Sequence, residues 1–347
     1  MSDCFIIAEA GVNHNGSLDL ALALCDAAKE AGADAVKFQT FRTDALLTDG
    51  VGLAPYQRRS VQSGDQRDLI RPLELSQDDF VRLYSHADSI GLRFLSTPHD
   101  DESLDFLISL GLTVIKVGSG DLVNVPFLRH VGSLGVDVIL STGMGDLGEV
   151  ELGVHTLEAS GAGELTLLHC TTEYPCPFEH VNLRAMQTLR SAFGVAVGYS
   201  DHTPGTVVPI AAVALGATVL EKHLTLDRSM PGPDHAASLD PAEFGAMVSA
   251  VRQVETALGS ARKQPSAPEL VTRSVVRKAI VAARPIRRGQ VIAAEDLTTK
   301  RSGRGVSPEI WDQVVGSVAL RDYAVDEPVD LRLEDSRTRP ERVVSGD

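Results

Sequence analysis

Short apolar segments alternate with longer helical patterns over about the first 260 residues of the chain, and this alternation limits the folds it can adopt. Each apolar segment ends at polar residues or glycine, which is typical of parallel strands buried on both faces. The predicted strands are 5–8, 35–39, 94–97, 114–117, 138–141, 165–169, 195–200 and 219–223. Eight such units in a stretch of this length predict an α/β fold of the (β/α)8, or TIM-barrel, type.

The helices predicted between these strands begin and end at recognisable signals. The first runs over 18–30, with Ser17 as its N-cap residue and Gly32 just beyond its end. The others are 78–89 and segments near 101–110, 124–134, 147–159, 182–192, 205–215 and 240–258. A doubly wound sheet is the main alternative, but no Gly-x-Gly-x-x-Gly fingerprint follows the first strand.

The distribution of charge divides the chain into two parts. Residues 1–261 carry a net charge of −18, whereas residues 262–347 carry +3, which together give the formal −15 of the whole chain. Prolines at 265 and 268 interrupt the polar stretch between the parts, which favours a linker. We therefore predict a barrel domain over 1–261, a linker over 262–272, a small domain over 273–335 and a polar tail over 336–347.

Composition excludes several classes of protein. The acidic balance argues against a nucleic-acid partner, which requires a basic surface. No apolar run reaches the roughly 18 residues of a membrane span, and no signal peptide precedes the first strand. The four cysteines are too few for a disulfide framework, so we expect reduced thiols and a cytoplasmic location.

Polar residues gather where the predicted strands end. In a barrel all these ends lie on one face, which is where barrel enzymes bind their substrates. Lys37 and Lys116, each at a strand end, could hold a phosphate or carboxylate group, although lysines can also extend past apolar surface into solvent. Four hydroxyl residues at neighbouring ends could complete such a site: Thr97, Ser119, Ser141 and Ser200.

Two histidines end the seventh and eighth strands, which are neighbours in a barrel. Neutral imidazoles of His202 and His223 could bind a divalent metal and leave positions open for substrate, although a buried histidine is more often structural. Glu9 at the first strand could transfer a proton nearby. The rigid loop 230–235 could present Asp234 to the hydroxyls of a sugar, or could be only a structural turn.

A Schiff-base aldolase is an alternative, with Lys37 or Lys116 as the reacting amine. It leaves the paired histidines unexplained.

These segments resemble the sialic acid synthase family, which includes N-acetylneuraminate synthases and their legionaminic and pseudaminic acid synthase relatives. The matching strings are IAEAGVNHNG at 7–16, AVKFQT at 35–40, STP at 96–98, IKVGSG at 115–120, LSTGM at 140–144, LHCT at 168–171, YP at 174–175, GYSDHT at 198–203, EKH at 221–223 and GPDH at 232–235. The later strings RRGQVI at 287–292, DL at 296–297 and KRSGRGV at 300–306 resemble the family's small, mainly β, antifreeze-like SAF domain.

The resemblance implies a metal-dependent condensation of phosphoenolpyruvate with open-chain N-acetylmannosamine, giving N-acetylneuraminate and phosphate. It implies Mn²⁺ as the metal, with Mg²⁺ or Co²⁺ as alternatives, and a domain-swapped homodimer. The implied roles are phosphoenolpyruvate binding by Lys37, Thr97, Lys116, Ser119, Ser141 and Ser200; catalysis by Glu9, Lys37, His202 and His223; metal ligation by His202 and His223; and sugar binding by Gln39, Tyr174, Asp234 and Arg301, the last from the partner's small domain.

One position departs from part of this family. Some members that form N-acetylneuraminate carry asparagine where this chain has Thr172, and the sequence at 172–175 is also similar to relatives that make legionaminic acid. That likeness gives the alternative acceptor 2,4-diacetamido-2,4,6-trideoxymannose.

A binding protein is the non-enzymatic alternative, because the small domain resembles ice-binding proteins and could bind carbohydrate on its own. The basic residues of this domain instead favour a role in which the domain covers an anionic site. They are Arg284, Arg287, Arg288, Lys300, Arg301 and Arg304.

Overall fold

The structure is a computed structural model that describes residues 3–53 and 65–330. The chain forms two compact units, Met1–Gly259 and Ser260–Asp347. In the described residues, no helix is long and apolar enough to cross a membrane.

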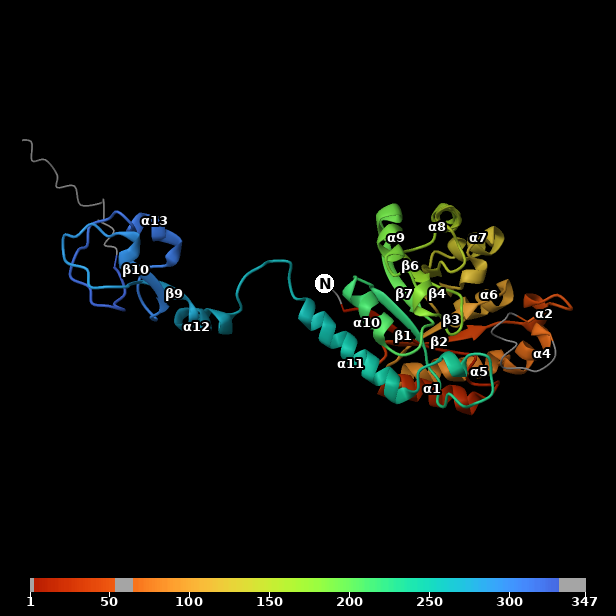
Figure 1. The fold of residues 1–347 in the computed structure, drawn as a ribbon. Coiled ribbons are helices and arrows are strands. Elements are labelled where there is room, and N and C mark those ends of the chain that lie inside the picture. Colours follow the sequence, from red (N-terminus) through yellow and green to blue (C-terminus); the bar gives the residue numbers. More distant parts are fainter. Residues whose placement is uncertain (1–2, 54–64, 331–347) are drawn as a thin grey trace, which may run out of the picture. The chain divides into compact units, whose positions relative to one another are not determined.

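The first unit is a nearly closed barrel of eight parallel strands, as the sequence predicts (Figure 1). The strands are β1 (Phe5–Gly11), β2 (Ala35–Thr40), β3 (Arg93–Pro98), β4 (Val114–Val117), β5 (Asp137–Ser141), β6 (Leu165–Cys170), β7 (Ala196–Asp201) and β8 (Val219–His223). Their order is β3-β2-β1-β8-β7-β6-β5-β4, and β3 and β4 at the two ends contact one another. The predicted strands agree with those of the structure to within three residues at each end.

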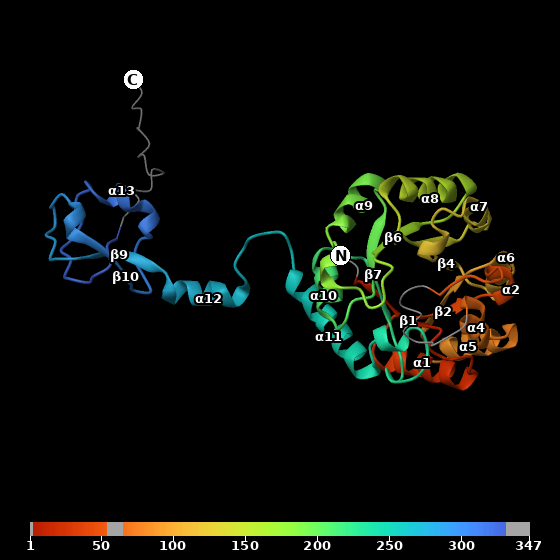
Figure 2. The same cartoon turned by 45° about the vertical axis from the view of Figure 1, so that its right-hand side comes forward.

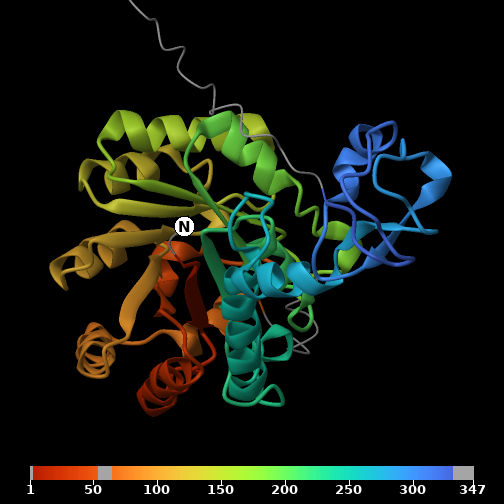
Figure 3. The same ribbon diagram turned by 90° about the vertical axis from the view of Figure 1, so that its left-hand side faces the viewer.

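Helices surround the strands on the outside of the barrel (Figures 2 and 3). They are α1 (Leu18–Glu30), α5 (Gln77–Ser89), α6 (Asp101–Ser109), α7 (Val125–Ser133), α8 (Leu147–Ser160), α9 (Ala185–Phe193), α10 (Val207–Ala214) and α11 (Pro241–Leu258). Side-chain caps start several of them: Ser17 caps α1, and the reciprocal pair Ser76 and Asp79 forms a capping box at α5. Local signals therefore define where these helices begin.

Two apolar layers hold the barrel together. The larger layer packs between strands and helices, and the smaller one fills the interior with residues such as Ile7, Leu95 and Leu168. Alternate residues of a strand face the same side, so Glu9 lies two residues above Ile7 and also points inward. The interior thus changes from apolar to charged toward the carboxyl ends of the strands.

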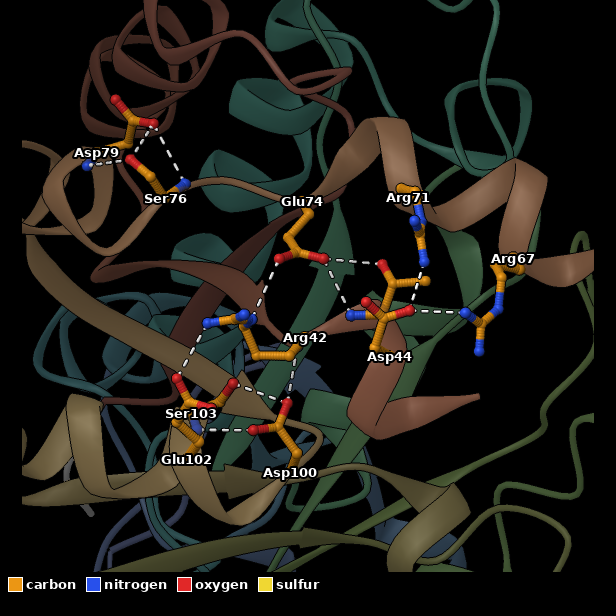
Figure 4. A network of polar contacts seen from close by, with 11 residues as sticks. Arg42, Asp44, Arg67, Arg71, Glu74, Ser76, Asp79, Asp100, Glu102 and Ser103 are labelled. Atoms are coloured by element: carbon orange, nitrogen blue, oxygen red, sulfur yellow. Dashed lines mark hydrogen bonds and ion pairs between the residues drawn. The ribbon is translucent and has the colours of Figure 1, made fainter. Parts of the chain in front are cut away.

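An insert between β2 and α5 contains short elements that the sequence patterns do not predict. They are α2 (Thr43–Leu46), α4 (Gln66–Ile70) and η1 (Arg71–Leu73). Asp44 of α2 accepts hydrogen bonds from both Arg67 and Arg71, which joins the beginning of the insert to its end (Figure 4).

The second unit has its own small core. Strands β9 (Lys278–Ala282) and β10 (Leu297–Arg301) pair antiparallel, and their apolar residues pack with Val314, Tyr323 and Val329. A short helix, α13 (Trp311–Val314), lies in the same unit.

Part of the stretch predicted to be a linker, 262–272, is helical. Helix α12 (Ala267–Val276) begins with a capping box between Ser266 and Glu269 and carries Pro268 in its first turn. Proline is tolerated there because the first N–H groups of a helix have no intrahelical partner. The polar tail predicted over 336–347 lies outside the described residues.

Candidate active site

A pocket of about 460 Å³ is lined by the carboxyl ends of the strands and the segments that follow them. Its lining contains each site residue that the sequence predicts within the barrel. They are Glu9, Lys37, Gln39, Thr97, Lys116, Ser119, Ser141, Tyr174, Ser200, His202, His223 and Asp234. The fold thus gathers residues that are up to 225 positions apart into one cavity.

Lys37 lies between two buried carboxylates on neighbouring strands. Its Nζ is 2.6 Å from Glu9 Oε2 and 3.7 Å from Glu221 Oε2. The same ammonium donates to Thr97 Oγ1 at 3.0 Å, and Gln39 Nε2 donates to Glu9 Oε1 at 3.2 Å. The cluster is buried, so its charges interact with little screening by solvent.

The two carboxyl groups respond to burial differently. Burial raises the pKa of Glu9 to about 7, because desolvation of the charged form outweighs the attraction of Lys37. Burial also disfavours the charged form of Glu221. The attraction of Lys37 and Lys116 and the hydrogen bond from Ser200 outweigh this effect, so the pKa of Glu221 is lowered to about 2. Glu221 is therefore ionised near neutral pH, whereas Glu9 is poised to exchange a proton.

Lys116 and three small residues form a second polar surface of the pocket. Lys116 Nζ donates to Ser141 Oγ at 2.6 Å, and Gly143 N donates to Ser119 Oγ at 3.0 Å. A Cβ atom at Gly143 would lie 2.4 Å from Thr172 Oγ1 and 2.8 Å from Ser119 Oγ. Only glycine fits at this position without displacing a side chain of the pocket. Burial, with Lys37 nearby, lowers the pKa of Lys116.

His202 and His223 lie side by side, with ring centroids 5.6 Å apart. His202 Nδ1 donates to the Thr171 carbonyl at 2.7 Å, so its Nε2 keeps a lone pair. Within the described residues, the buried Nδ1 of His223 has no hydrogen-bond partner. Burial lowers the pKa of both imidazoles, and for His223 the neighbouring His202 lowers it further. Both rings are therefore neutral near pH 7.

A buried ion pair holds the two strands that carry these histidines. Lys222 Nζ is 2.5 Å from Asp201 Oδ2, and the two residues are directly paired between β7 and β8. Each residue precedes one of the histidines in the sequence, so the pair fixes their relative position. Leaving one buried partner without the other would be strongly destabilising.

The imidazoles fit a divalent metal ion. The fit rests on two neutral rings: His202 has a lone pair on Nε2, and Nδ1 of His223 has no partner among the described residues. Across residues 3–53 and 65–330, no group of three or more His, Cys, Asp or Glu side chains is arranged as a metal site. A metal bound here would therefore take its other ligands from substrate or water.

The remaining predicted sugar-binding residues lie in different places. The centroids of the Tyr174 and His202 rings lie 4.1 Å apart. Asp234 is buried and lines the pocket. Burial raises the pKa of Asp234 to about 6, although Lys37 opposes this. Arg301 is exposed at the end of β10 in the second unit.

Sequence reasoning did not assign a role to two residues of this pocket. Glu221 accepts from Ser200 Oγ at 2.8 Å and faces Lys37, and His99 also lines the cavity. The signal for Glu221 is its position two residues before His223, which places both side chains on the same face of β8. His99 follows β3 directly, where strand ends predict pocket residues.

Comparisons with known proteins agree on a single family. The NeuB family model matches residues 24–263, and the SAF domain model matches residues 277–331. The chain is 49% identical to an N,N'-diacetyllegionaminic acid synthase from Legionella pneumophila, over 90% of each chain. It is 45% identical to a protein of the same name from Campylobacter jejuni, over 94% of this chain and 99% of that one.

A solved structure agrees with these matches. It is the N-acetylneuraminic acid synthetase of Leptospira borgpetersenii in complex with citrate, with 33% identity and a TM-score of 0.71. The match covers 79% of this chain and 93% of the solved chain.

Proposed function

Because the chain belongs to the NeuB family of phosphoenolpyruvate-dependent nonulosonic acid synthases, we propose that it makes N,N'-diacetyllegionaminic acid. The proposed acceptor is 2,4-diacetamido-2,4,6-trideoxymannose, and phosphate is the second product. N-Acetylmannosamine is the acceptor that the sequence analysis places first. The two diacetyllegionaminic acid synthases, at 49% and 45% identity, support the other acceptor better.

One observation carries the proposal: two lysines and four hydroxyl residues share a pocket with two neutral histidines. Lys37 and Lys116 supply positive charge for the phosphate and carboxylate of phosphoenolpyruvate. Thr97, Ser119, Ser141 and Ser200 supply the hydroxyl donors. The barrel unit as a whole has a net charge of −18. The two lysines and the hydroxyl donors provide the local positive field that a trianionic substrate requires.

The proposed reaction forms one C–C bond and, at C2, replaces the C–O bond to phosphate with a C–O bond to an oxygen from water. C3 of phosphoenolpyruvate attacks the aldehyde carbon of the acceptor, whose oxygen takes up a proton. Water adds to the cation at C2 and loses a proton, and the resulting tetrahedral intermediate expels phosphate to leave a ketone. Glu9, with a pKa of about 7, is suited to accept the proton of the water.

The remaining residues position the acceptor. Gln39, Tyr174 and Asp234 line the pocket beside the histidines, where they can contact the sugar. Holding both substrates in one cavity removes much of the entropic barrier of a two-substrate reaction. His202 and His223 would hold Mn²⁺, which when bound polarises the acceptor carbonyl as a Lewis acid.

The small domain has a part in the proposal. We place Arg301 at the acceptor in the partner subunit of a domain-swapped homodimer. The exposure of this arginine at a strand end supports the assignment, because its guanidinium is accessible to a ligand.

A phosphate-release assay tests the proposed function. With phosphoenolpyruvate and Mn²⁺, the protein should release phosphate fastest with the diacetamido acceptor and more slowly with N-acetylmannosamine. Arabinose 5-phosphate as the best acceptor would contradict the proposal. Chelation should stop release and Mn²⁺ restore it, whereas inactivation by borohydride with substrate would support a Schiff-base aldolase.

A further inference from the structure

One side of the active-site pocket is apolar, and the proposed reaction does not yet use it. This apolar wall consists of Phe41, Leu46, Leu47, Leu69, Ile70 and Leu73, which all line the cavity. Phe41 follows β2, and the other five belong to the insert between β2 and α5. Phe41 and Leu73 are buried and form an apolar cluster with Val12, Leu46 and Ile70.

Part of the apolar side-chain surface of this wall is exposed in the cavity. Leu46, Leu47, Leu69 and Ile70 are only half-buried, although they line a concave pocket. Such surface is stabilised when an apolar group of a ligand covers it. Gln66 is the one polar residue that the described part of the insert adds to the lining.

A network of ion pairs holds the insert in place (Figure 4). Asp44 joins α2 to α4 and η1 through Arg67 and Arg71, and Glu74 accepts from Thr43 N at 3.0 Å and Thr43 Oγ1 at 2.9 Å. A third arginine in the network, Arg42, pairs with Glu74 and Glu102, which ties the insert to helix α6. In the described part of the insert, Arg42, Arg67 and Arg71 therefore each pair with a carboxylate.

No cation lies on the apolar wall within the described lining. The lining residues that can carry positive charge are two lysines and three histidines, and each lies at or directly after a barrel strand: Lys37, His99, Lys116, His202 and His223. Phosphoenolpyruvate carries no alkyl group that the apolar wall could cover, and its charges match the two lysines. The wall must therefore face the acceptor.

We infer that the apolar wall binds the methyl-bearing end of the acceptor and selects a 6-deoxy sugar over one with hydroxyl or phosphate at C6. This inference rests on the proposed function, whose acceptor carries a C6 methyl and two acetamido methyls. A methyl group in an apolar pocket changes kcat/KM by roughly 10- to 200-fold. A phosphate would lose its hydration there without gaining a cationic partner from the described residues of the wall.

Substitutions on the apolar wall test the inference through the ratio of two acceptors. Leu69→Asn should lower kcat/KM for the diacetamido acceptor about tenfold or more relative to N-acetylmannosamine, with KM for phosphoenolpyruvate unchanged. Ile70→Lys should lower the same ratio and give measurable turnover with N-acetylmannosamine 6-phosphate. Leu152→Asn, at an exposed leucine of α8, is the matched control and should leave every ratio unchanged.

The outcomes separate the two proposals. If the wild type prefers the diacetamido acceptor and both wall variants keep the wild-type ratio, the inference is overturned while the proposed function stands. If the wild type prefers N-acetylmannosamine, or releases phosphate with neither acceptor, the proposed acceptor is wrong and the inference falls with it.

Discussion

Two glutamates within a few ångströms of Lys37 have different pKa values. Burial dominates at Glu9 and raises its pKa, whereas Lys37, Lys116 and the Ser200 hydroxyl together lower the pKa of Glu221. The pair can thus supply a fixed negative charge and a proton acceptor in the same cavity. Pairs of groups whose pKa values are pushed apart are typical of acid–base sites.

Asp234 gives a prediction about pH. Its carboxyl has a pKa of about 6, raised by burial, so it is charged above that pH and protonated below. Protonation turns one of the two acceptor oxygens into a hydroxyl donor and removes the negative charge, so the group accepts hydrogen bonds from two sugar hydroxyls less well. KM for the acceptor should therefore rise as pH falls from 7 to 5, as measured by initial rates. Asp234→Asn should raise KM and flatten this dependence; the same dependence in the variant would contradict the assignment.

The two histidines give a prediction about metal binding. His202→Ala and His223→Ala should each weaken Mn²⁺ binding by at least tenfold, because each removes one of two protein ligands. Titration followed by electron paramagnetic resonance measures free Mn²⁺ without relying on turnover. His155→Ala, an exposed histidine of α8, is the control. Wild-type affinity in either ligand variant would disprove the assignment.

Sequence alone locates the candidate site residues better than it explains their chemistry. Strand ends predict that Glu9, Lys37 and His223 face one pocket, since topology determines which ends meet. The pKa of Glu9 depends on how near Lys37 and Glu221 lie across strands, which no local pattern encodes. The apolar wall was missed for a similar reason.

At the scale of elements, the insert after β2 differs from the barrel helices. The long helices are predictable because they combine amphipathic patterns with caps such as Ser76 and Asp79. Helices α2 and α4 have four and five residues, too short for a periodic signal. Contacts between distant parts of the chain position them: Leu46 and Ile70 pack with Phe41 and Leu73, and ion pairs near the surface, such as Arg67 with Asp44, add to this.

The cap of α5 gives a prediction about stability. Ser76→Ala should lower the free energy of unfolding of the barrel by about 1 kcal/mol, because it removes the acceptor of the Asp79 N–H. Urea unfolding followed by far-ultraviolet circular dichroism measures this. Ser85→Ala, within the same helix, should change little, since Ser85 only donates back to the Val81 carbonyl. Equal losses in the two variants would refute the role of the cap.

At the scale of the whole molecule, two units with separate cores carry opposite charge. The barrel unit is strongly acidic, whereas the smaller unit has a slight basic excess. Of the acidic residues in the described part of the barrel, only Glu9, Glu221 and Asp234 line the pocket that contains Lys37 and Lys116.

Mixing two inactive variants tests the proposed domain-swapped homodimer. Arg301→Ala lacks the small-domain arginine, and His202→Ala lacks one of the two proposed metal ligands of the barrel. In a swapped dimer, co-refolded or co-expressed mixtures form one site from the intact barrel of one subunit and the intact small domain of the other. Activity should therefore return in the mixture. Mixtures no more active than the separate variants would contradict the swap.

Competition between acceptors tests the central claim most directly. The protein is incubated with phosphoenolpyruvate, Mn²⁺ and equal concentrations of 2,4-diacetamido-2,4,6-trideoxymannose and N-acetylmannosamine, and mass spectrometry measures the two nonulosonic acids. The product ratio equals the ratio of kcat/KM values. We predict at least a tenfold excess of N,N'-diacetyllegionaminic acid. An excess of N-acetylneuraminate, or no condensation product at all, would contradict the proposed function.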